Sequence, residues 1–304
     1  MKTSRPFPAL MIGIAAVLAV SARAADPEVI AIASKASKDY HRKKLPDGTF
    51  QPETYAFGKG DNLGARVDPT VDRLDFMDVA RTIAVPLAEK GYVPTQDPKT
   101  TNLLIMVYWG TTQAPEYATE SSSHDLAQKA TQAQAAAVTA LRDAIKPQEQ
   151  RAAQAELADA DSQLLTANIA IQAENQRRED TDMRNATLLG YDSWWVATNS
   201  AMGGSPLGRR RADMEAELEE DRYFVVLSAF DYQALVRQKK TRFLWEVRFS
   251  IREHGNAFDS RLAAMVARAS DYFGRDSGGL QHVDLPEGKV EIGPVKSLGV
   301  VDGK

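Results

Sequence analysis

The 304-residue chain contains no cysteine. This absence excludes disulfide bonds, thiolate metal sites and the lipidated cysteine that anchors a lipoprotein. Stability must then come from the burial of apolar side chains, and an apolar content of 43% is enough for a packed core. Only four histidines occur, and no two of them have the helical spacing of a metal-chelating pair. We therefore expect no metal and no cofactor.

Long apolar runs are also scarce. The longest, Ala9 to Val20, is shorter than the about 20 residues that a membrane-spanning helix needs. It follows Lys2 and Arg5 and precedes Ala22-Arg23-Ala24, which fits the A-x-A cleavage rule. We predict a signal peptide over residues 1–24, export to the periplasm or the extracellular space, and no transmembrane span after cleavage.

The charge balance bears on possible partners. The net charge is −4, and residues 1–24 hold three basic and no acidic residues, so the mature chain would carry −7. Nucleic acid is not an expected partner of such a chain, because binding to phosphate backbones relies on Lys and Arg.

The first part of the chain indicates a helix followed by a buried strand. Apolar positions from Leu74 to Leu87 recur on one helical face, with Pro69 at the start and Gly91 at the exit. Pro86 is expected to kink or shorten the last turn. The run Leu103 to Trp109 is apolar on both faces, which predicts a central strand of a covered sheet, with the helix as its cover.

The middle of the chain is rich in alanine and glutamine, and small or apolar residues recur there at alternating steps of four and three. They form two sets, Leu126, Ala130, Ala133, Ala137 and Ala140, and then Ala153, Leu157, Ala160, Leu164, Ala167 and Ile171. Pro147 between the sets suits the start of a second helix. The pattern predicts an antiparallel helical hairpin with a coiled-coil seam, which fades after Gln172.

The last part returns to a strand pattern. From Phe243 to Ile251 apolar and polar residues alternate, and residues 222–232 are the expected hairpin partner across a turn at 235–241. An apolar stripe from Phe258 to Tyr272 predicts a helix that Gly274 closes. A short strand near Val290 would complete the sheet.

These elements predict an α/β (α+β) fold, in which two helices cover a mixed sheet and a long antiparallel helical hairpin is inserted. The expected boundaries are a signal peptide at 1–24, a first α/β part at 25–115, the insertion at 116–220 and a second α/β part at 221–304.

Three segments carry a resemblance to a known family. "ETYAFGKG" before the first helix, "LAEKGY" at its end and "RFLWEVRFSIRE" in the second part are similar to a bacterial envelope family described only as a domain of unknown function. Many members look like lipoproteins, whereas this chain lacks the anchoring cysteine, and its helical insertion is not part of the shared pattern. The resemblance implies an α/β envelope module without an assigned activity.

Two groups of residues are candidates for chemistry. The segment "GRDSGGL" around Ser277 is similar to the nucleophile loop of trypsin-like proteases, but no histidine stands in a matching context, so we favour a structural loop. Asp68, Asp72, Asp75 and Asp78 could ligate a cation. We favour a solvated helix face, because acidic residues in a first helical turn are stabilised by the helix dipole.

Two further groups are candidates for an interaction surface. Tyr191, Trp194 and Trp195 lie beside a glycine-rich segment and could contact a protein or a glycan, but docking of the hairpin onto the α/β body is favoured. Arg209, Arg210 and Arg211 could bind a partner. They precede an acidic run, 213–221, which we expect to be neutralised within the molecule, near Arg248 and Arg252.

The sequence thus favours an exported binding or structural module of the cell envelope over an enzyme. One alternative is an accessory subunit of an envelope assembly that uses the hairpin as its contact arm. Another is an exported hydrolase that uses Ser277 or an acidic pair. An envelope protein or a glycan is the expected partner.

Overall fold

The computed structural model describes residues 28–64, 66–115 and 122–285. The predicted signal peptide and the predicted strand near Val290 lie outside these residues. The described chain builds one seven-stranded sheet in the order β3-β2-β4-β5-β6-β1-β7. Its strands are β1 (Val29–Ala36), β2 (Glu53–Asn62), β3 (Tyr92–Pro94), β4 (Leu103–Thr111), β5 (Arg222–Asp231), β6 (Phe243–Arg252) and β7 (Gln281–Asp284).

The sheet is mixed, as predicted. Strand β2 runs parallel to both of its neighbours, β3 and β4, whereas all other pairs are antiparallel. The predicted β5–β6 hairpin is present, with Arg222 paired to Arg252. Strands β1, β3 and β7 were not expected. β1 lies between β6 and β7 and so joins the start of the described chain to its end.

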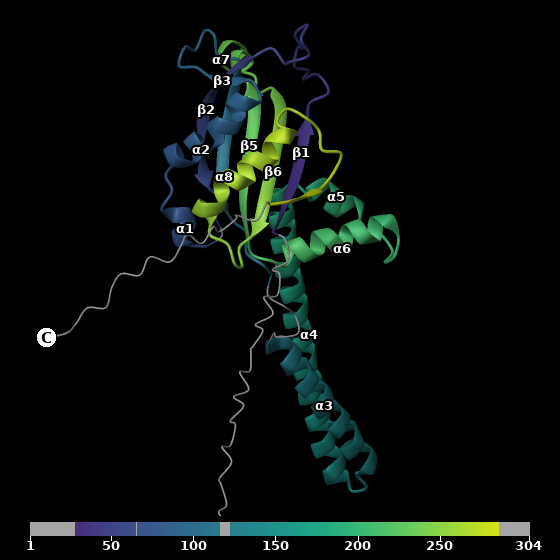
Figure 1. Ribbon diagram of the computed structural model, residues 1–304. Coiled ribbons are helices and arrows are strands. Elements are labelled where there is room, and N and C mark those ends of the chain that lie inside the picture. Colours follow the sequence, from purple (N-terminus) through teal and green to yellow (C-terminus); the bar gives the residue numbers. More distant parts are fainter. Residues whose placement is uncertain (1–27, 65, 116–121, 286–304) are drawn as a thin grey trace, which may run out of the picture.

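Two helices cover one face of the sheet, α2 (Phe76–Glu89) and α8 (Phe258–Ala269), which a short 3₁₀ turn extends over Ser270–Tyr272. Figure 1 shows both lying across the strands. Alternate residues of β4 and β6 point into this core, which is centred on the fully buried Trp245 and also contains Ile83, Leu87, Ile105, Val107, Val247, Phe249, Leu262 and Met265. The predicted two-helix cover is therefore confirmed.

The first helical segment is divided, contrary to the prediction of one continuous helix. α1 (Pro69–Asp72) ends before Asp75, which caps a new helix. The Asp75 side chain accepts from the backbone of Asp78, and the Asp78 side chain accepts from that of Asp75, so the two form a capping box. α2 then continues past Pro86 to Glu89 and is not shortened there. Met77, predicted on the buried face, is exposed.

The link between β5 and β6 is another correction. The predicted turn at 235–241 overlaps a short helix, α7 (Tyr232–Gln238). It forms because the Asp231 side chain accepts a hydrogen bond of 2.9 Å from the backbone of Ala234, an N-cap that the sequence analysis overlooked.

The predicted helical hairpin is present, and Figure 1 shows it projecting beyond the end of the sheet. It consists of α3 (Ser122–Asp143) and the 43-residue α4 (Pro147–Leu189), with Pro147 in the first turn of α4 as predicted. We call this pair the arm. On α4 the predicted seam is confirmed, since Ala153, Ala160 and Ala167 are buried.

Two details of the seam differ from the prediction. On α3, Ala130 and Ala137 are buried, but Leu126, Ala133 and Ala140 are exposed, and Ala127, Gln134 and Leu141 take the intervening positions. On α4 the seam does not fade after Gln172. Less exposed residues continue at the same steps to the buried pair Asn185 and Ala186 and the end of the helix.

The opposite face of the sheet receives the base of the arm together with α5 (Asp192–Ala197) and α6 (Pro206–Leu218). This second core contains Ala31, Ala186, Leu189, Tyr191, Trp195, Met214, Leu218, Phe224 and Val226. Part of the segment assigned to the insertion is therefore packed on the body. Within the described parts of the chain, no helix has both the length and the apolarity that crossing a membrane requires.

The alanine seam generates a prediction. Ala160 is 4% exposed, and Ala160→Phe should lower the free energy of unfolding by about 1–3 kcal/mol, because the phenyl ring overpacks a close helix–helix contact. Urea unfolding followed by circular dichroism measures the change. Ala158→Phe, at an exposed position of the same helix, is the control. Equal effects of the two substitutions would contradict the seam.

Candidate functional site

The chain turns sharply where the arm meets the sheet. Gly190 ends α4 in the left-handed conformation, with φ of 86°, and the backbone of Tyr191 donates to the carbonyl of Ala186 at 2.7 Å. A Cβ atom at Gly190 would lie 2.8 Å from Cδ of Arg248 and 3.2 Å from Cβ of Ala33. Only glycine fits this contact between the arm and the sheet.

The three aromatic residues singled out from the sequence follow this turn. Tyr191 and Trp195 are 2% and 8% exposed and belong to the second core, whereas Trp194 is partly buried at its edge. They pack the base of the arm onto the sheet, as the docking interpretation predicted. A role in contacting a partner stays a prediction for Trp194, the one of the three that is more accessible.

The three arginines have different environments. Arg209 donates to the carbonyl of Gly204 at 2.8 Å. Arg211 donates to the carbonyl of Trp195 and to Glu215, both at 2.8 Å, and lies over the ring of Trp195. These contacts give both side chains a structural role. Arg210 instead lies over the ring of Trp194, 4.5 Å from its centroid, without an ion pair among the described residues.

Trp194 and Arg210 form one side of a cavity of about 290 Å³, whose other walls are strands β1 and β6 and the loop 276–280. Charged groups of both signs line it, namely Lys35, Asp192, Arg210, Glu246, Arg248 and Asp276. An aromatic ring beside charged groups of both signs is an arrangement that suits a polar ligand with some apolar surface, such as a sugar or a peptide.

Ser277 also lines this cavity, but it fastens a loop. Its Oγ accepts from the backbone of Ser34 at 2.9 Å and lies 3.0 Å and 2.6 Å from the carbonyl oxygens of Ser34 and Gly279. The backbone of Ser277 also donates to Ser34 at 3.0 Å. Within the described residues no histidine is hydrogen-bonded to it. The geometry supports the structural interpretation of "GRDSGGL".

The loop contacts make a prediction. Ser277→Ala should lower the free energy of unfolding by about 0.5–1.5 kcal/mol, the net value of a typical hydrogen bond, and should leave any hydrolysis of a generic ester probe unchanged. Denaturant unfolding and an esterase assay measure the two effects. The control is Ser193→Ala, at an exposed serine of the same cavity. A specific loss of hydrolysis in folded Ser277→Ala would restore the nucleophile hypothesis.

A buried ionic network that the sequence analysis missed lies behind Tyr191. Glu217 on α6 is 7% exposed; its carboxylate accepts from the Tyr191 hydroxyl at 2.5 Å and is hydrogen-bonded to the imidazole of His282 on β7. Arg222 lies 3.6 Å from the same carboxylate and also contacts Ser250 at 3.0 Å. The network borders a cavity of about 370 Å³.

The charges in this network shift the pKa values of its members. The hydrogen bond to the carboxylate of Glu217 raises the pKa of His282, against the effect of burial. Burial alone would raise the pKa of Glu217, but the hydrogen bond from His282 and the charge of Arg222 hold it below its usual value. Burial and the neighbouring Glu217 charge raise the pKa of Tyr191. At neutral pH, Glu217 is therefore an ionised acceptor and Tyr191 a neutral donor.

A histidine oriented by a buried carboxylate is also the base of a catalytic triad. In the described part of the chain, however, no hydroxyl nucleophile is hydrogen-bonded to the His282 ring. The pair instead joins two elements, since it links the edge strand β7 to α6. The acidic Asp213, which lines the same cavity, adds to the rise in the pKa of His282.

The pH dependence of stability tests this link. His282 has a raised pKa in the folded state, so its contribution is complete below about pH 6.5 and is lost as the pH rises through the folded pKa. Glu217 has a lowered pKa, so its contribution is present above about pH 4.5 and is lost as the pH falls through its folded pKa. The Glu217–His282 pair therefore stabilises the folded state most between about pH 4.5 and about pH 6.5.

His282→Gln should therefore cost more stability at pH 5.5 than at pH 8.5 (about one unit below and two above the ordinary histidine pKa), as measured by urea unfolding. His254→Gln, at an exposed histidine after β6, is the control and should show no such difference. A cost for His282→Gln that does not change with pH would contradict the charged link.

The acidic run 213–221 is neutralised within the molecule, but by other partners than predicted. Its ion pairs are Glu215 with Arg211, Glu217 and Glu220 with Arg222, Glu219 with Arg178, and Asp221 with Arg66. Arg248 pairs with Glu246 and Arg252 with Glu28. The predicted pairing of the run with Arg248 and Arg252 is wrong, although β5 and β6 have the predicted register.

Three of the four aspartates in the first helical segment, Asp68, Asp75 and Asp78, act in helix caps, and Asp72 accepts from the backbone of Asp68 at 3.1 Å. Asp68 accepts from the backbone of Thr70 at 2.7 Å and from the Tyr223 hydroxyl at 2.9 Å. Asp75 and Asp78 form the capping box described above. Over residues 28–285, apart from the gaps, no group of three or more His, Asp or Glu side chains is arranged to hold a metal ion.

Comparison with known proteins does not assign the chain to a family. A scan against models of protein families found no match, and a search of curated proteins found no similar sequence. The resemblance to an envelope family therefore stays a prediction.

Proposed function

We propose that the protein is an exported binding module of the cell envelope that uses the arm to contact a protein partner in an envelope assembly. The arm is the observation that carries this proposal. Export is expected from residues 1–24 alone.

The dimensions of the arm support a contact role. At 1.5 Å per residue, the 43 residues of α4 span about 65 Å. Only the last part of this helix packs on the sheet, and α3 packs along α4. Because most of the arm covers no part of the body, the stability of the body does not explain its presence.

The outer surface of the arm also carries apolar side chains. Ile145 at the turn between the helices is 87% exposed, and Leu165 and Ile169 on α4 are 63% and 58% exposed. Leu165 and Ile169 are four residues apart and therefore share one face of the helix. Exposed apolar side chains far from the core are candidates for a protein interface.

The groups that could perform chemistry favour binding over catalysis. Ser277 holds a loop, and Glu217 and His282 link α6 to β7. The cavity beside Trp194 is a second place where such a module could bind a ligand, and its mixed charges favour a glycan or a peptide there. A hydrolase would need one of these groups to be released from its structural contact.

Photo-cross-linking in intact cells tests the contact role. A photoreactive residue is placed at Ile145, and a matched control is placed at Val67 on the body, because both side chains are 87% exposed. We expect a discrete adduct from Ile145 and none from Val67. Export is checked on the same material by sequencing the mature N-terminus, expected at Ala25.

A trimmed arm provides the second half of the test. Residues 131–166 are replaced by a short Gly/Ser linker, which keeps the base of the arm and the bond of 2.7 Å from Asn185 to the carbonyl of Gln113. The trimmed protein should unfold cooperatively. With the probe at Ile169 in both proteins, the full-length chain should form the adduct and the trimmed chain should not. A labelling pattern at Ile145 that equals that at Val67 would contradict the proposal.

A further inference from the structure

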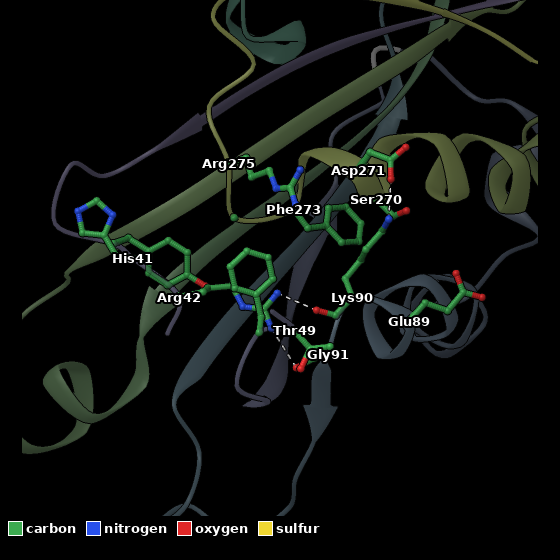
Figure 2. Close-up of a pocket in the computed structure, with 13 residues that line it drawn as sticks. His41, Arg42, Thr49, Glu89, Lys90, Gly91, Ser270, Asp271, Phe273 and Arg275 are labelled. Carbon is green, nitrogen blue, oxygen red and sulfur yellow. Dashed lines mark hydrogen bonds and ion pairs between the residues drawn. The ribbon is translucent and has the colours of Figure 1, made fainter. Parts of the chain in front are cut away.

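A third cavity lies at the end of the body opposite the arm. Its volume is about 450 Å³, and its walls are the segment 40–50, the C-terminal end of α2 and residues 270–275 after α8 (Figures 1 and 2). This volume is within the range of small-molecule sites, about 300–1,000 Å³. Tyr40, Phe50 and Phe273 provide its aromatic surface.

Arg42 prepares the cavity for a negative charge. Its guanidinium donates to the carbonyl oxygens of Lys90 at 2.7 Å and Gly91 at 3.2 Å, which lie at the end of α2. A helix C-terminus carries a partial negative charge that repels anions, and Arg42 offsets it. The side chain is 6% exposed, and its Nε atom has no hydrogen-bond partner in the described structure.

The carboxylate nearest to Arg42 is already engaged. Glu53 lies 3.7 Å from Nε of Arg42 and accepts a hydrogen bond of 2.5 Å from the Tyr40 hydroxyl. Burial, and then the neighbouring Tyr92, raise the pKa of Tyr40, so this hydroxyl remains a neutral donor. Arg42 is thus held in place by the carbonyl oxygens of Lys90 and Gly91 and by its ion pair with Glu53.

Two cations beside Phe50 have no carboxylate partner. Among the described residues, Lys44 and Arg275 form no ion pair, and their charged groups lie 5.6 Å and 6.0 Å from the centroid of the Phe50 ring. These residues place positive charge around one aromatic ring, although the chain as a whole has a net charge of −4.

Two carboxylates lie at the same cavity. Asp271 is bound by Lys90 at 2.5 Å. Figure 2 shows the carboxylate of Glu89 directed away from Arg42 and Arg275. Neither of them therefore neutralises the cations around Phe50.

We propose that this cavity binds a phosphate-bearing ligand, with the phosphate between Arg275 and Lys44 and its organic part against Phe50. A phosphate fits better than a carboxylate, because its oxygens can meet cations that come from separate segments. The ligand is either a soluble phosphate ester or the headgroup of a phospholipid, since both present the same group.

Two probes distinguish these sources. Binding of glycerol 3-phosphate to the mature chain is measured by calorimetry, and binding to vesicles of phosphatidylglycerol by flotation, with phosphatidylcholine vesicles as the neutral reference. Binding of the soluble probe alone identifies a soluble ester. Flotation with phosphatidylglycerol alone identifies a membrane headgroup, and binding of both identifies the shared phosphate as sufficient.

Arg275→Gln should weaken whichever binding is found by at least about tenfold, the loss of one charge-assisted contact. Lys44→Gln should do the same. Lys129→Gln, at an exposed lysine of the arm, removes the same charge and is the control. Arg42 is left unchanged because it caps α2, and thermal unfolding verifies that each variant is folded.

The proposal is wrong if neither probe binds, or if Arg275→Gln and Lys129→Gln weaken binding equally. The latter result would show a general effect of net charge and no site. Because the arm is intact in the Arg275 and Lys44 variants, cross-linking from Ile145 is expected to persist in them. This outcome separates the anion site from the proposed contact role of the arm.

Discussion

Strand β5 is buried on both faces, and both cores of the protein depend on this. Tyr223, Val225 and Leu227 face α2 and α8, whereas Phe224 and Val226 face the base of the arm. Such two-sided burial is typical of a strand that is covered by helices on both sides. Detaching the arm would therefore expose Phe224 and Val226 to water, so the arm and the α/β body are joined through one strand.

The fold class could be predicted because its main signals are strong and local. The alternation in β6 has the two-residue period of a strand, and the apolar stripe of α8 has the period of a helix. The structure follows both patterns. The α3 seam was harder, because alanine occupies so many positions that two stripes share Ala130 and Ala137. The break before α2 and the helix α7 depend on caps by Asp75 and Asp231, which are short signals that a longer apolar pattern hides.

The candidate sites were predicted less completely, and the reason is distance along the chain. Tyr191 and Trp195 were recognised because two bulky aromatic residues usually need a core. Glu217 and His282 are 65 positions apart, and only the fold brings them together. One signal was present: Glu217 lies between the apolar Met214 and Leu218 on the buried side of α6, where an acidic residue requires partners. The cavity around Arg275 is built from three separate segments, and no local pattern describes it.

The unbroken course of α4 has a mechanical consequence. A helix without a hinge transmits load along its axis, and this one runs from the turn near Ile145 to Gly190 without an interruption. At its C-terminal end the carbonyls of Thr187 and Leu188 accept hydrogen bonds from Arg248 on β6. A force applied at the turn near Ile145 would therefore be transmitted along α4 to β6 through these hydrogen bonds.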